Sequence, residues 1–518
     1  MLARCNSAAL VGLEARPVAV EVDLAPGLPG LLMVGLPDAA VQESRERVRA
    51  ALRNSGWRMP LTRVVVNLAP ADLRKEGPAF DLPIALALLA ASGQLNPQHL
   101  AGVWCAGELG LDGQLRAVRG GLAIALAARQ AGARALLLPA ANGAEAALVQ
   151  GLPLWPAADL EGALRWLQNP AAAAAAGPGP LPQAQAEATL AAPPARSLDL
   201  SEVRGQPHGR RALAISAAGG HHLLLVGPPG SGKTMLARCL PGLLPPLSPE
   251  ERLELSVLYS VAGLLPAGPL LLAQRPFRSP HHSCSAAALV GGGSQPRPGE
   301  LSLAHHGVLF LDELAEFRRD VINQLRQPLE QGELWLSRAR QRLRFPCRLT
   351  LVAATNPCPC GWWGDAIRPC SCGEGLRQRY WGRISGPLLD RLDLQVVMRR
   401  LSADELVPRQ CWPLQPQNSR TVARQVLNAR RRMVRRNPGG VPNGLLEGDA
   451  LRQLAGLEGE ALELWQGAIR QRGLSARGAE RLLRVGRTIA DLADEATVGA
   501  GAIAEALHYR SFDRPLEA

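Results

Sequence analysis

The sequence predicts an α/β fold divided into several domains, and three observations support this prediction. Apolar runs alternate with charged, helix-like stretches over residues 1–168, and the alternation resumes over residues 197–400. A low-complexity segment rich in alanine, proline and glycine lies between these regions at residues 169–196. The chain has 518 residues, several times the size of a common domain, so we expect more than one hydrophobic core.

Residues 1–168 are expected to form an N-terminal α/β domain. The stretch from Val18 to Leu24 is apolar at every second position, which is typical of a strand with one buried face. The charged stretch from Glu43 to Asn54 has a helical pattern and is followed by Gly56, as is common where helices end. The segment 169–196 offers little to bury, so we predict a flexible linker there.

Residues 197–400 are expected to form a nucleotide-binding core with a parallel sheet. The sequences HHLLLVGPPG, GVLFLDEL and RLTLVAATNP are apolar runs followed by polar turns, the pattern of central strands buried on both faces. Residues 401–518 contain helix-like stretches separated by glycines, including Thr421 to Arg436 and Ala476 to Asp494. We expect these residues to form a C-terminal helical lid.

The charge and cysteine content indicate a partner and a compartment. The formal net charge of +12 favours a polyanionic partner, with nucleic acid as the leading candidate. Ten cysteines in so long a chain do not indicate a secreted disulfide scaffold, and charges appear before any signal-length apolar core. The apolar runs at residues 82–91 and 120–128 are too short to cross a bilayer. We therefore expect a cytoplasmic protein without a membrane span.

The sequence GPPGSGKT matches a phosphate-binding loop in the context that such a loop requires. It follows the apolar run LLLV and precedes the helix-like MLARCL. In such loops, glycines let backbone amides approach the phosphates, Lys233 reaches the β and γ groups, and the Thr234 hydroxyl binds Mg²⁺. Lys233 is one of only two lysines among 57 basic residues. The predicted ATP-binding residues are Gly227, Pro228, Pro229, Gly230, Ser231, Gly232, Lys233 and Thr234.

Three further polar residues follow apolar runs and are predicted to act on the nucleotide. Asp312 ends the second apolar run and is expected to bind Mg²⁺, directly or through water. Glu313 follows it and is expected to polarise the attacking water. Asn356 ends the third run, where an amide can hydrogen-bond both the γ-phosphate and that water. The alternative for the carboxylates is a pair of solvated acids at a strand end.

Two arginines are candidates for contacts with the γ-phosphate. Arg391, in SGPLLDRLDL, is predicted to be an arginine finger that reaches the nucleotide of a neighbouring subunit. Arg477, in LSARGAERLLR, is predicted to be a sensor within its own chain. The alternative for each, in a chain so rich in arginine, is an ordinary surface charge.

Four cysteines with the spacing C-x-C-x₉-C-x-C predict a structural metal site. Tetrahedral Zn²⁺ is the metal that four thiolates favour, and the alternative is a set of reduced, unliganded thiols. The histidine pairs at residues 281–282 and 305–306 are not expected to form a second metal site, because adjacent residues on a strand point to opposite sides. The predicted zinc ligands are Cys358, Cys360, Cys370 and Cys372.

The segment LWLSRARQRLRFPC is predicted to form a hairpin that contacts DNA. Its four arginines alternate along the chain, which places them on one face of a strand, as a loop that follows phosphates requires. The alternative is a solvated strand face. The predicted DNA-contacting residues are Arg338, Arg340, Arg342 and Arg344.

The sequences RPFRSPHHS, ALVGGG, PRPGELSLAHHGVLFLDELAEF and ISGPLLDRLDL closely resemble the ComM/YifB family of magnesium-chelatase-like AAA+ proteins. In the N-terminal part, GLPDAAVQESRERVRAAL and VNLAPADLRKEGPAFDLPIAL resemble the Lon protease-like (S5-like) domain of the same family. The resemblance covers nearly the whole chain except the linker. It implies an AAA+ core with a helix-2 insert, a C-terminal helical lid, and a homo-hexameric ring that uses ATP and Mg²⁺.

The resemblance further implies a DNA translocase or helicase for branch migration of recombination intermediates during natural transformation. A protease is not expected, because Ala79 occupies the position of the nucleophilic serine and VRGGLAIALAARQ contains no lysine. Two alternatives remain open. One is the motor subunit of a magnesium chelatase, and the other is a MoxR-like assembly chaperone.

Overall fold

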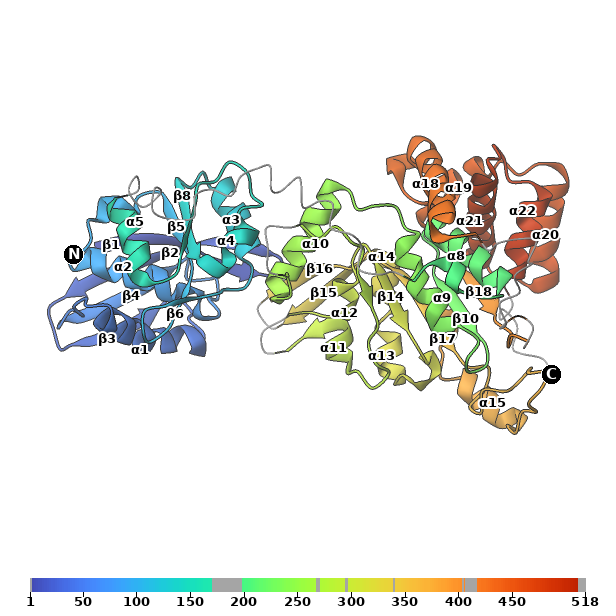
Figure 1. Cartoon of the computed structure of the whole chain (residues 1–518), viewed down its shortest axis with the longest axis horizontal. Helices are drawn as coiled ribbons and strands as arrows, with labels where there is room; N and C mark the ends of the chain where they lie inside the picture. Colours follow the sequence, from blue (N-terminus) through green and yellow to red (C-terminus); the bar gives the residue numbers. More distant parts are fainter. Residues whose placement is uncertain are drawn as a thin grey trace. The chain divides into compact units, whose positions relative to one another are not determined.

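The computed structural model describes most of the chain and divides it into two compact units (Figure 1). Unit 1 comprises Met1–Pro193, Pro249–Ala273 and Ser337–Arg344, and unit 2 comprises Pro194–Ser248, Gln274–Leu336 and Phe345–Ala518. Each unit is described by itself below. The residues described are 2–169, 198–266, 271–293, 297–338, 341–402, 405 and 417–510.

Unit 1 is built on a mixed seven-stranded sheet with the strand order β3-β4-β2-β1-β5-β8-β9. Strand β2 pairs antiparallel with β1 and β4, and the outer neighbours pair in parallel. The strand predicted from Val18 to Leu24 lies within β2, where the side chains of Val18, Val20 and Val22 are buried. The strands are β1 (Leu2–Val11), β2 (Glu14–Ala25), β3 (Gly30–Val34), β4 (Arg63–Ala69), β5 (Val103–Cys105), β8 (Ala135–Pro139) and β9 (Leu154–Ala157).

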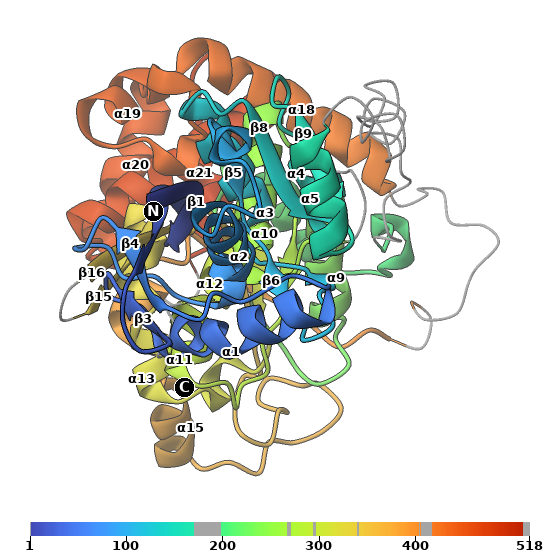
Figure 2. The ribbon, with the colours of Figure 1, turned by 90° about the vertical axis from the view of Figure 1, so that its left-hand side faces the viewer.

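Helices cover both faces of this sheet, because neighbouring residues of a buried strand point in opposite directions. Leu137 of β8 belongs to the core shared with α1 (Ala39–Asn54), α2 (Asp81–Ala91) and α5 (Leu160–Gln168). Leu136 and Leu138 belong to the core on the other face, shared with α3 (Gly121–Gln130), α4 (Ala140–Ala146) and α10 (Pro249–Ala262). Figure 2 shows the ribbon turned by 90° about the vertical axis, with the elements of residues 1–168 drawn from blue to cyan. The helix predicted from Glu43 to Asn54 is the C-terminal part of α1.

The predicted domain limits and the observed units differ in two segments. Helix α10 and residues 337–344 lie within the sequence of the predicted nucleotide-binding core, yet both belong to unit 1. Leu253, Val257 and Val261 of α10 pack into the second core of that unit. The Ser260 hydroxyl donates a hydrogen bond of 2.6 Å to Glu145. Helix α10 therefore packs on the sheet of unit 1, although Pro194–Ser248 before it and Gln274–Leu336 after it in the sequence belong to unit 2.

Unit 2 contains a fully parallel five-stranded sheet with the order β11-β14-β17-β10-β18. The three predicted central strands are confirmed as β10, β14 and β17, which are adjacent and buried along their whole length. Helix α8 (Pro207–Gly219) precedes β10, and α9 (Lys233–Cys239) follows it. The strands are β10 (Leu223–Val226), β11 (Phe277–Arg278), β14 (Val308–Leu311), β17 (Thr350–Thr355) and β18 (Leu394–Val397).

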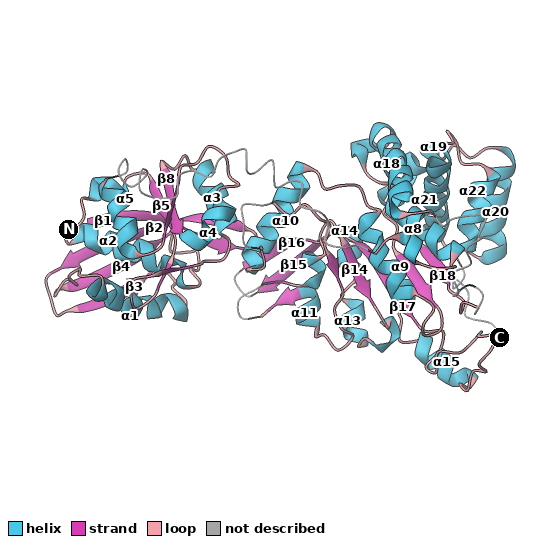
Figure 3. Cartoon of the chain, in the orientation of Figure 1, coloured by secondary structure: helices cyan, strands magenta, loops and turns pink. Residues whose placement is uncertain are grey.

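The C-terminal part of unit 2 is helical in its described residues (Figure 3). The two helices predicted here are confirmed as α18 and α21. A buried network holds them together, since Asp491 of α21 accepts hydrogen bonds from Arg436 of α18 at 2.6 Å and from Arg487 at 2.9 Å. The helices are α18 (Ser419–Arg436), α19 (Gly448–Ala455), α20 (Gly459–Arg472), α21 (Ala476–Ala493) and α22 (Ala500–His508).

Short elements complete the two units. The sequences ALVGGG and LWLSRARQRLRF contribute to two-stranded sheets, β12 with β13 and β15 with β16. In the part of the chain that the structure describes, no helix is both long and apolar enough to cross a membrane. The short elements are β6 (Glu108–Leu109), β7 (Leu115–Arg116), α11 (Ala286–Val290), β12 (Gly291–Gly292), β13 (Arg297–Pro298), α12 (Glu300–Leu303), α13 (Arg319–Asn323), α14 (Arg326–Gln331), β15 (Glu333–Arg338), β16 (Gln341–Pro346), α15 (Glu374–Trp381) and α16 (Gly386–Leu389).

Candidate active site

The phosphate-binding sequence forms the turn between β10 and α9. Gly230 and Gly232 have φ angles of +77° and +89°, a conformation that residues with a side chain rarely adopt. Helix α9 begins at Lys233, so the turn runs directly into a helix N-terminus, whose free N–H groups and dipole favour a bound phosphate. The sequence folds here into the strand, loop and helix that phosphate binding requires.

Lys233 is buried at the centre of the site and is held by oxygen atoms. Its Nζ donates hydrogen bonds to the carbonyl oxygens of Gly227 at 2.6 Å and Pro228 at 3.0 Å, and to Asn356 Oδ1 at 3.2 Å. Burial lowers the pKa of Lys233 to about 8, although the nearby carboxylates of Asp312 and Glu313 favour its charged form. An anion bound at this position would therefore stabilise the charged form of Lys233.

The predicted acidic pair lies beside this lysine. Thr234 Oγ1 donates a hydrogen bond of 3.0 Å to Asp312 Oδ2, so the hydroxyl and the carboxylate predicted to bind Mg²⁺ are adjacent. The carboxyl ends of β10, β14 and β17 lie at one edge of the sheet because the strands are parallel and aligned. This alignment brings together Lys233, Thr234, Asp312 and Asn356, which lie far apart in the sequence.

Glu313 has a partner that the sequence did not identify. Its carboxylate Oε2 lies 3.1 Å from His282 Nδ1, and its backbone has a positive φ of +52°. His282 is half-buried in the turn after β11, the strand next to β14. The sequence showed only a pair of adjacent histidines, and the parallel pairing of β11 with β14 is what carries one of them to the acidic residue.

A second unpredicted residue supports the phosphate-binding loop from the side of β18. Gln206, which precedes α8, is buried and has a positive φ of +50°. Its Nε2 donates to the carbonyl oxygen of Ser231 at 3.1 Å and to that of Arg399 at 2.6 Å. The amide thus ties the loop to the chain that follows β18. A single glutamine outside any motif carries no signal that could reveal this role.

The two candidate arginines meet at one carboxylate. Arg391 donates hydrogen bonds to Glu330 of α14 and to the carbonyl oxygen of Arg326, the latter at 3.1 Å. Arg477, at the start of α21, has Nη1 3.8 Å from Oε1 of the same Glu330. The Arg477 side chain is 78% exposed, whereas that of Arg391 is 17% exposed. Their predicted roles on a nucleotide remain predictions.

The four predicted metal ligands converge. The Sγ atoms of Cys358, Cys360 and Cys370 are separated by 3.3 to 3.6 Å, and all four Sγ atoms, including that of Cys372, lie within 4.8 Å of one another. A tetrahedral zinc site with Zn–S bonds of about 2.3 Å has sulfur atoms about 3.8 Å apart. Four sulfur ligands and no open position are typical of a structural rather than a catalytic metal.

The predicted DNA-contacting arginines are only partly covered by the described structure. Arg342 and Arg344 of β16 are exposed and alternate with the buried Leu343 and Phe345, as expected for one polar face. Arg340 and the side chain of Arg338 lie outside the described residues.

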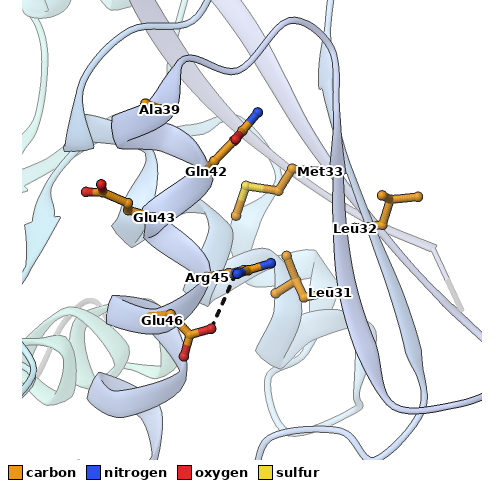
Figure 4. A pocket seen from close by; sticks show the side chains of 8 residues that line it. All are labelled: Leu31, Leu32, Met33, Ala39, Gln42, Glu43, Arg45 and Glu46. Atoms are coloured by element: carbon orange, nitrogen blue, oxygen red, sulfur yellow. Dashed lines mark ion pairs between the residues drawn. The ribbon is translucent and has the colours of Figure 1, made fainter.

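A shallow pocket of about 440 Å³ lies elsewhere, in unit 1, between β3 and α1 (Figure 4). Leu31 and Met33 point toward α1, and Arg45 and Glu46 form an ion pair of 3.3 Å at its rim. The residues that line it include none of the predicted nucleotide ligands. The pocket therefore does not belong to the phosphate site.

Comparison with known proteins agrees with this geometry. Residues 199–406 match the family model of magnesium chelatase subunit ChlI, residues 416–510 match that of its C-terminal region, and residues 20–142 match a further ChlI model. The nucleotide constellation, the cysteine cluster and Arg391 all lie in the first match. Arg477 lies in the second.

Individual relatives extend the match over the full chain. It is 43% identical over 511 residues to the uncharacterized protein YifB of Escherichia coli (strain K12), covering 99% of this chain and 97% of YifB. It is 42% identical over 519 residues to competence protein ComM of Haemophilus influenzae, covering 100% of this chain and 99% of ComM. Lon protease 2 of Bacillus subtilis (strain 168) is 28% identical over 153 residues, or 28% of this chain and 27% of the protease. The chain belongs to the magnesium-chelatase-like ComM/YifB family.

Proposed function

We propose that this chain is a cytoplasmic, ATP-dependent DNA translocase or helicase that promotes branch migration of recombination intermediates during natural transformation. The family implies an ATPase that uses ATP and Mg²⁺. The observation that carries the further step to DNA is the similarity, over the full chain, to a competence protein. The net charge of +12 agrees with a polyanionic track.

The residues of the site divide the work of phosphoryl transfer. Lys233 binds the β and γ phosphates, and Thr234 and Asp312 supply the oxygen atoms for Mg²⁺, which neutralises phosphate charge when bound. Glu313 orients and polarises the attacking water, and Asn356 holds that water and the γ-phosphate in line. His282 Nδ1 lies 3.1 Å from one oxygen of the Glu313 carboxylate and can orient it, which leaves the other oxygen for the attacking water.

A homo-hexameric ring completes the site in this proposal. Arg391 acts as a finger on the nucleotide of the neighbouring subunit, and Arg477 acts as a sensor in its own chain. Arg391 donates to Glu330 and Arg477 lies near the same carboxylate, so in this proposal phosphate competes with Glu330 for the two guanidinium groups. Rings that mix wild-type chains with Arg391→Ala chains test this. Each mutant chain should stop hydrolysis at the site of the neighbouring wild-type chain. If the wild-type sites keep their activity in mixed rings, Arg391 is a surface charge.

The hairpins β12–β13 and β15–β16 line the ring axis in this proposal and follow the DNA backbone. Exposed Arg342 and Arg344 are suited to phosphate contacts, and Arg338 and Arg340 are proposed to extend the same face. The N-terminal domain is proposed to be Lon-like without protease activity, because Ala79 provides no nucleophilic hydroxyl. It serves as a platform for DNA binding or ring assembly.

The cysteine cluster is proposed to hold one structural Zn²⁺ per chain. Three of its sulfur–sulfur distances, 3.3 to 3.6 Å, are close to those of a tetrahedral thiolate site. Elemental analysis of purified protein tests this directly. One zinc per chain is expected, and a metal-free protein with full activity would leave the cysteines as unliganded thiols.

The ATPase rate measured with different effectors separates this function from its rivals. We expect stimulation by single-stranded, duplex or four-way junction DNA, with no effect of porphyrin. A magnesium-chelatase motor subunit predicts a response to porphyrin with its partner subunits, and a MoxR-like assembly chaperone predicts stimulation by a client protein and indifference to DNA. A rate that no DNA changes would contradict the translocase proposal while leaving the ATPase intact.

A further inference from the structure

The cysteine loop, residues 356–373, carries the four cysteines and begins at Asn356, the amide predicted to act on the nucleotide. Cys358 follows Asn356 by two residues, and its side chain is fully buried. The Gly361 N–H donates to the Cys358 carbonyl oxygen at 2.9 Å, and the Trp363 N–H donates to Cys358 Sγ at 3.3 Å. These bonds turn the backbone tightly around Cys358. The position of Gly361 therefore depends on where the Cys358 sulfur is held.

Gly361 touches the phosphate-binding loop. Its φ is +83°, and a Cβ atom added to it would lie only 2.8 Å from Cδ of Pro229 and 3.9 Å from Cγ of Asn356. The backbone of the cysteine loop is thus packed against Pro229, inside the GPPGSGKT sequence, at the side where Asn356 meets Lys233. Any displacement of Gly361 changes the support of both residues.

The phosphate-binding loop is held from a second direction, so it cannot simply follow the cysteine loop. Gln206 binds the carbonyl oxygen of Ser231 at 3.1 Å and that of Arg399 at 2.6 Å. The next residue, Arg400, has its guanidinium 5.9 Å from the ring of Trp362, which adjoins Gly361. Pro229 and Ser231 therefore lie between two supports, and one of them is the cysteine loop.

The loop has no regular secondary structure, since residues 356–373, all of which the structure describes, contain no helix or strand. Besides the four sulfur atoms, it is held by two arginines. Arg377 donates to the Cys372 carbonyl oxygen at 3.0 Å and lies 5.4 Å from the Trp363 ring, and Arg368 lies 4.7 Å from the Trp362 ring. The two ends are anchored near β17, since Trp381 Nε1 donates to the Pro357 carbonyl oxygen at 3.0 Å and Tyr380 Oη lies 3.2 Å from Thr355 Oγ1. A metal that joins Cys358 and Cys360 to Cys370 and Cys372 removes further conformational freedom from the segment between these anchors.

We propose that the cysteine loop is a metal-dependent brace for the ATP site, in which Gly361 is a positioning residue that transmits the state of the thiolate site to Pro229 and Asn356. This inference rests on the proposed zinc site and adds that zinc and nucleotide bind cooperatively. The ligand is a thiophilic divalent ion, with Zn²⁺ as the expected one. Metal loss loosens Gly361 and thereby lowers the affinity for nucleotide, while Lys233, Thr234 and Asp312 stay in place.

Thermodynamic linkage provides a test on the wild-type chain that does not depend on hydrolysis. If zinc raises nucleotide affinity by some factor, nucleotide must raise zinc affinity by the same factor. The rate at which a zinc-selective chromogenic chelator removes the metal is measured with and without a non-hydrolysable ATP analogue and Mg²⁺. We expect the analogue to slow removal by about tenfold, a common size for such coupling. The Lys233→Ala chain, which is expected to bind the analogue roughly a hundredfold or more weakly, should lose zinc at one rate in both conditions when the analogue is well below its weakened Kd.

Two glycines of the loop form a matched pair of variants. Gly361 and Gly364 have nearly equal φ angles of +83° and +79°, but a Cβ at Gly364 meets no atom within 4 Å. Both alanine variants keep all four cysteines and carry the same backbone strain, so both should bind one zinc. We expect Gly361→Ala to weaken the binding of a fluorescent ATP analogue by about tenfold and Gly364→Ala to bind it as the wild type does.

The outcomes separate the brace from the proposals on which it rests. Zinc bound in both variants with equal nucleotide affinity, together with zinc release that ignores nucleotide, would overturn the brace and leave the zinc site standing. Protein that neither contains nor takes up zinc overturns the zinc site and the metal dependence of the brace together, and elemental analysis identifies that case. Failure of DNA to stimulate the ATPase bears on the translocase proposal alone.

Discussion

The two lysines of this chain are both buried and both donate hydrogen bonds to carbonyl oxygens, but they differ in the other side chains near the ammonium group. Lys75 in unit 1 is completely buried and donates hydrogen bonds to the carbonyl oxygens of Gly35, at 2.9 Å, and Pro70. Lys233 in unit 2 also donates to two carbonyl oxygens, those of Gly227 and Pro228. Lys233 also meets the amide of Asn356, and two carboxylates, Asp312 and Glu313, favour its charge. Lys75 has one such carboxylate, that of Asp72.

Rarity and burial therefore do not identify a functional lysine in this protein. Lys75 ties the segment after β4 to the turn after β3, since its own N–H also donates to the Leu36 carbonyl oxygen at 3.2 Å. Lys233 stands at a helix N-terminus beside glycines that leave room for phosphate. We infer that Lys75 stabilises the fold and that Lys233 binds ligand, and the following experiments test this difference.

The largest expected effect is the loss of nucleotide binding in Lys233→Ala. Without the ammonium, the β and γ phosphates lose a charged hydrogen-bond donor in a desolvated site, so we expect affinity to fall by roughly a hundredfold or more. Binding of a fluorescent ATP analogue measures this. Equal affinity of Lys233→Ala and wild type would remove the distinction between the two lysines.

Glu313→Gln should separate binding from chemistry. The amide retains the shape of the side chain but cannot accept a proton, so nucleotide affinity stays within about twofold while hydrolysis slows by roughly 10²- to 10⁴-fold. Single-turnover hydrolysis and analogue binding on the same preparation measure the two quantities. A variant that hydrolyses ATP at the wild-type rate would contradict the assignment of Glu313.

Nucleotide affinity should fall as the pH rises above 8. In the free protein the pKa of Lys233 is lowered to about 8 by burial, whereas bound phosphate favours the ammonium. Binding above pH 8 must then take up a proton, and the affinity falls by up to about tenfold per pH unit. Calorimetry in two buffers of different ionisation enthalpy measures that uptake, and binding without proton uptake at pH 9 would contradict the lowered pKa.

The same shift has a consequence for folding, with a definite sign. Between pH 8 and the ordinary lysine pKa, the unfolded chain binds more protons at Lys233 than the folded chain does. The contribution of this residue to the free energy of unfolding therefore increases with pH over that window. Lys233→Ala should lack this contribution.

Lys75→Met should affect stability and leave nucleotide binding unchanged. The substitution removes the buried ammonium that donates to the carbonyl oxygens of Gly35 and Pro70, which costs about 1–3 kcal/mol of the free energy of unfolding. Urea denaturation measures the stability, and analogue binding serves as the control. A loss of nucleotide affinity in folded Lys75→Met would mean that Lys75 has a role in the ATP site.

The smallest effect concerns basic residues that are exposed instead of buried. Replacing Arg342 and Arg344 by alanine should weaken DNA binding. It should also reduce the slope of log K against log salt concentration by roughly one to two units, because binding releases fewer counterions when phosphate contacts are lost. Basal ATPase should persist. DNA titrations at several salt concentrations measure the slope, and an unchanged slope with normal unwinding of branched DNA would return these arginines to a solvated strand face.

Much of the fold was predictable because its signals are local. Apolar runs predict the strands β10, β14 and β17. Helical spacing between glycines predicts the helices α18 and α21. The placement of α10 in unit 1 was not predictable, because the apolar residues Leu253, Val257 and Val261 would suit any core. Only the tertiary structure shows that the N-terminal sheet offers the surface they cover.

The sequence by itself determined the turn and helix start from Gly227 to Thr234, since a glycine-rich turn before a helix specifies its backbone within eight residues, and it predicts phosphate binding there. It also indicated Asp312, Glu313 and Asn356 through the strands that they follow. The contacts of His282 with Glu313, of Glu330 with both arginines, and of Gly361 with Pro229 were decided by the tertiary structure. Each joins residues more than thirty positions apart. The order of strands in the parallel sheet and the packing of helices on it, not any local pattern, bring them together.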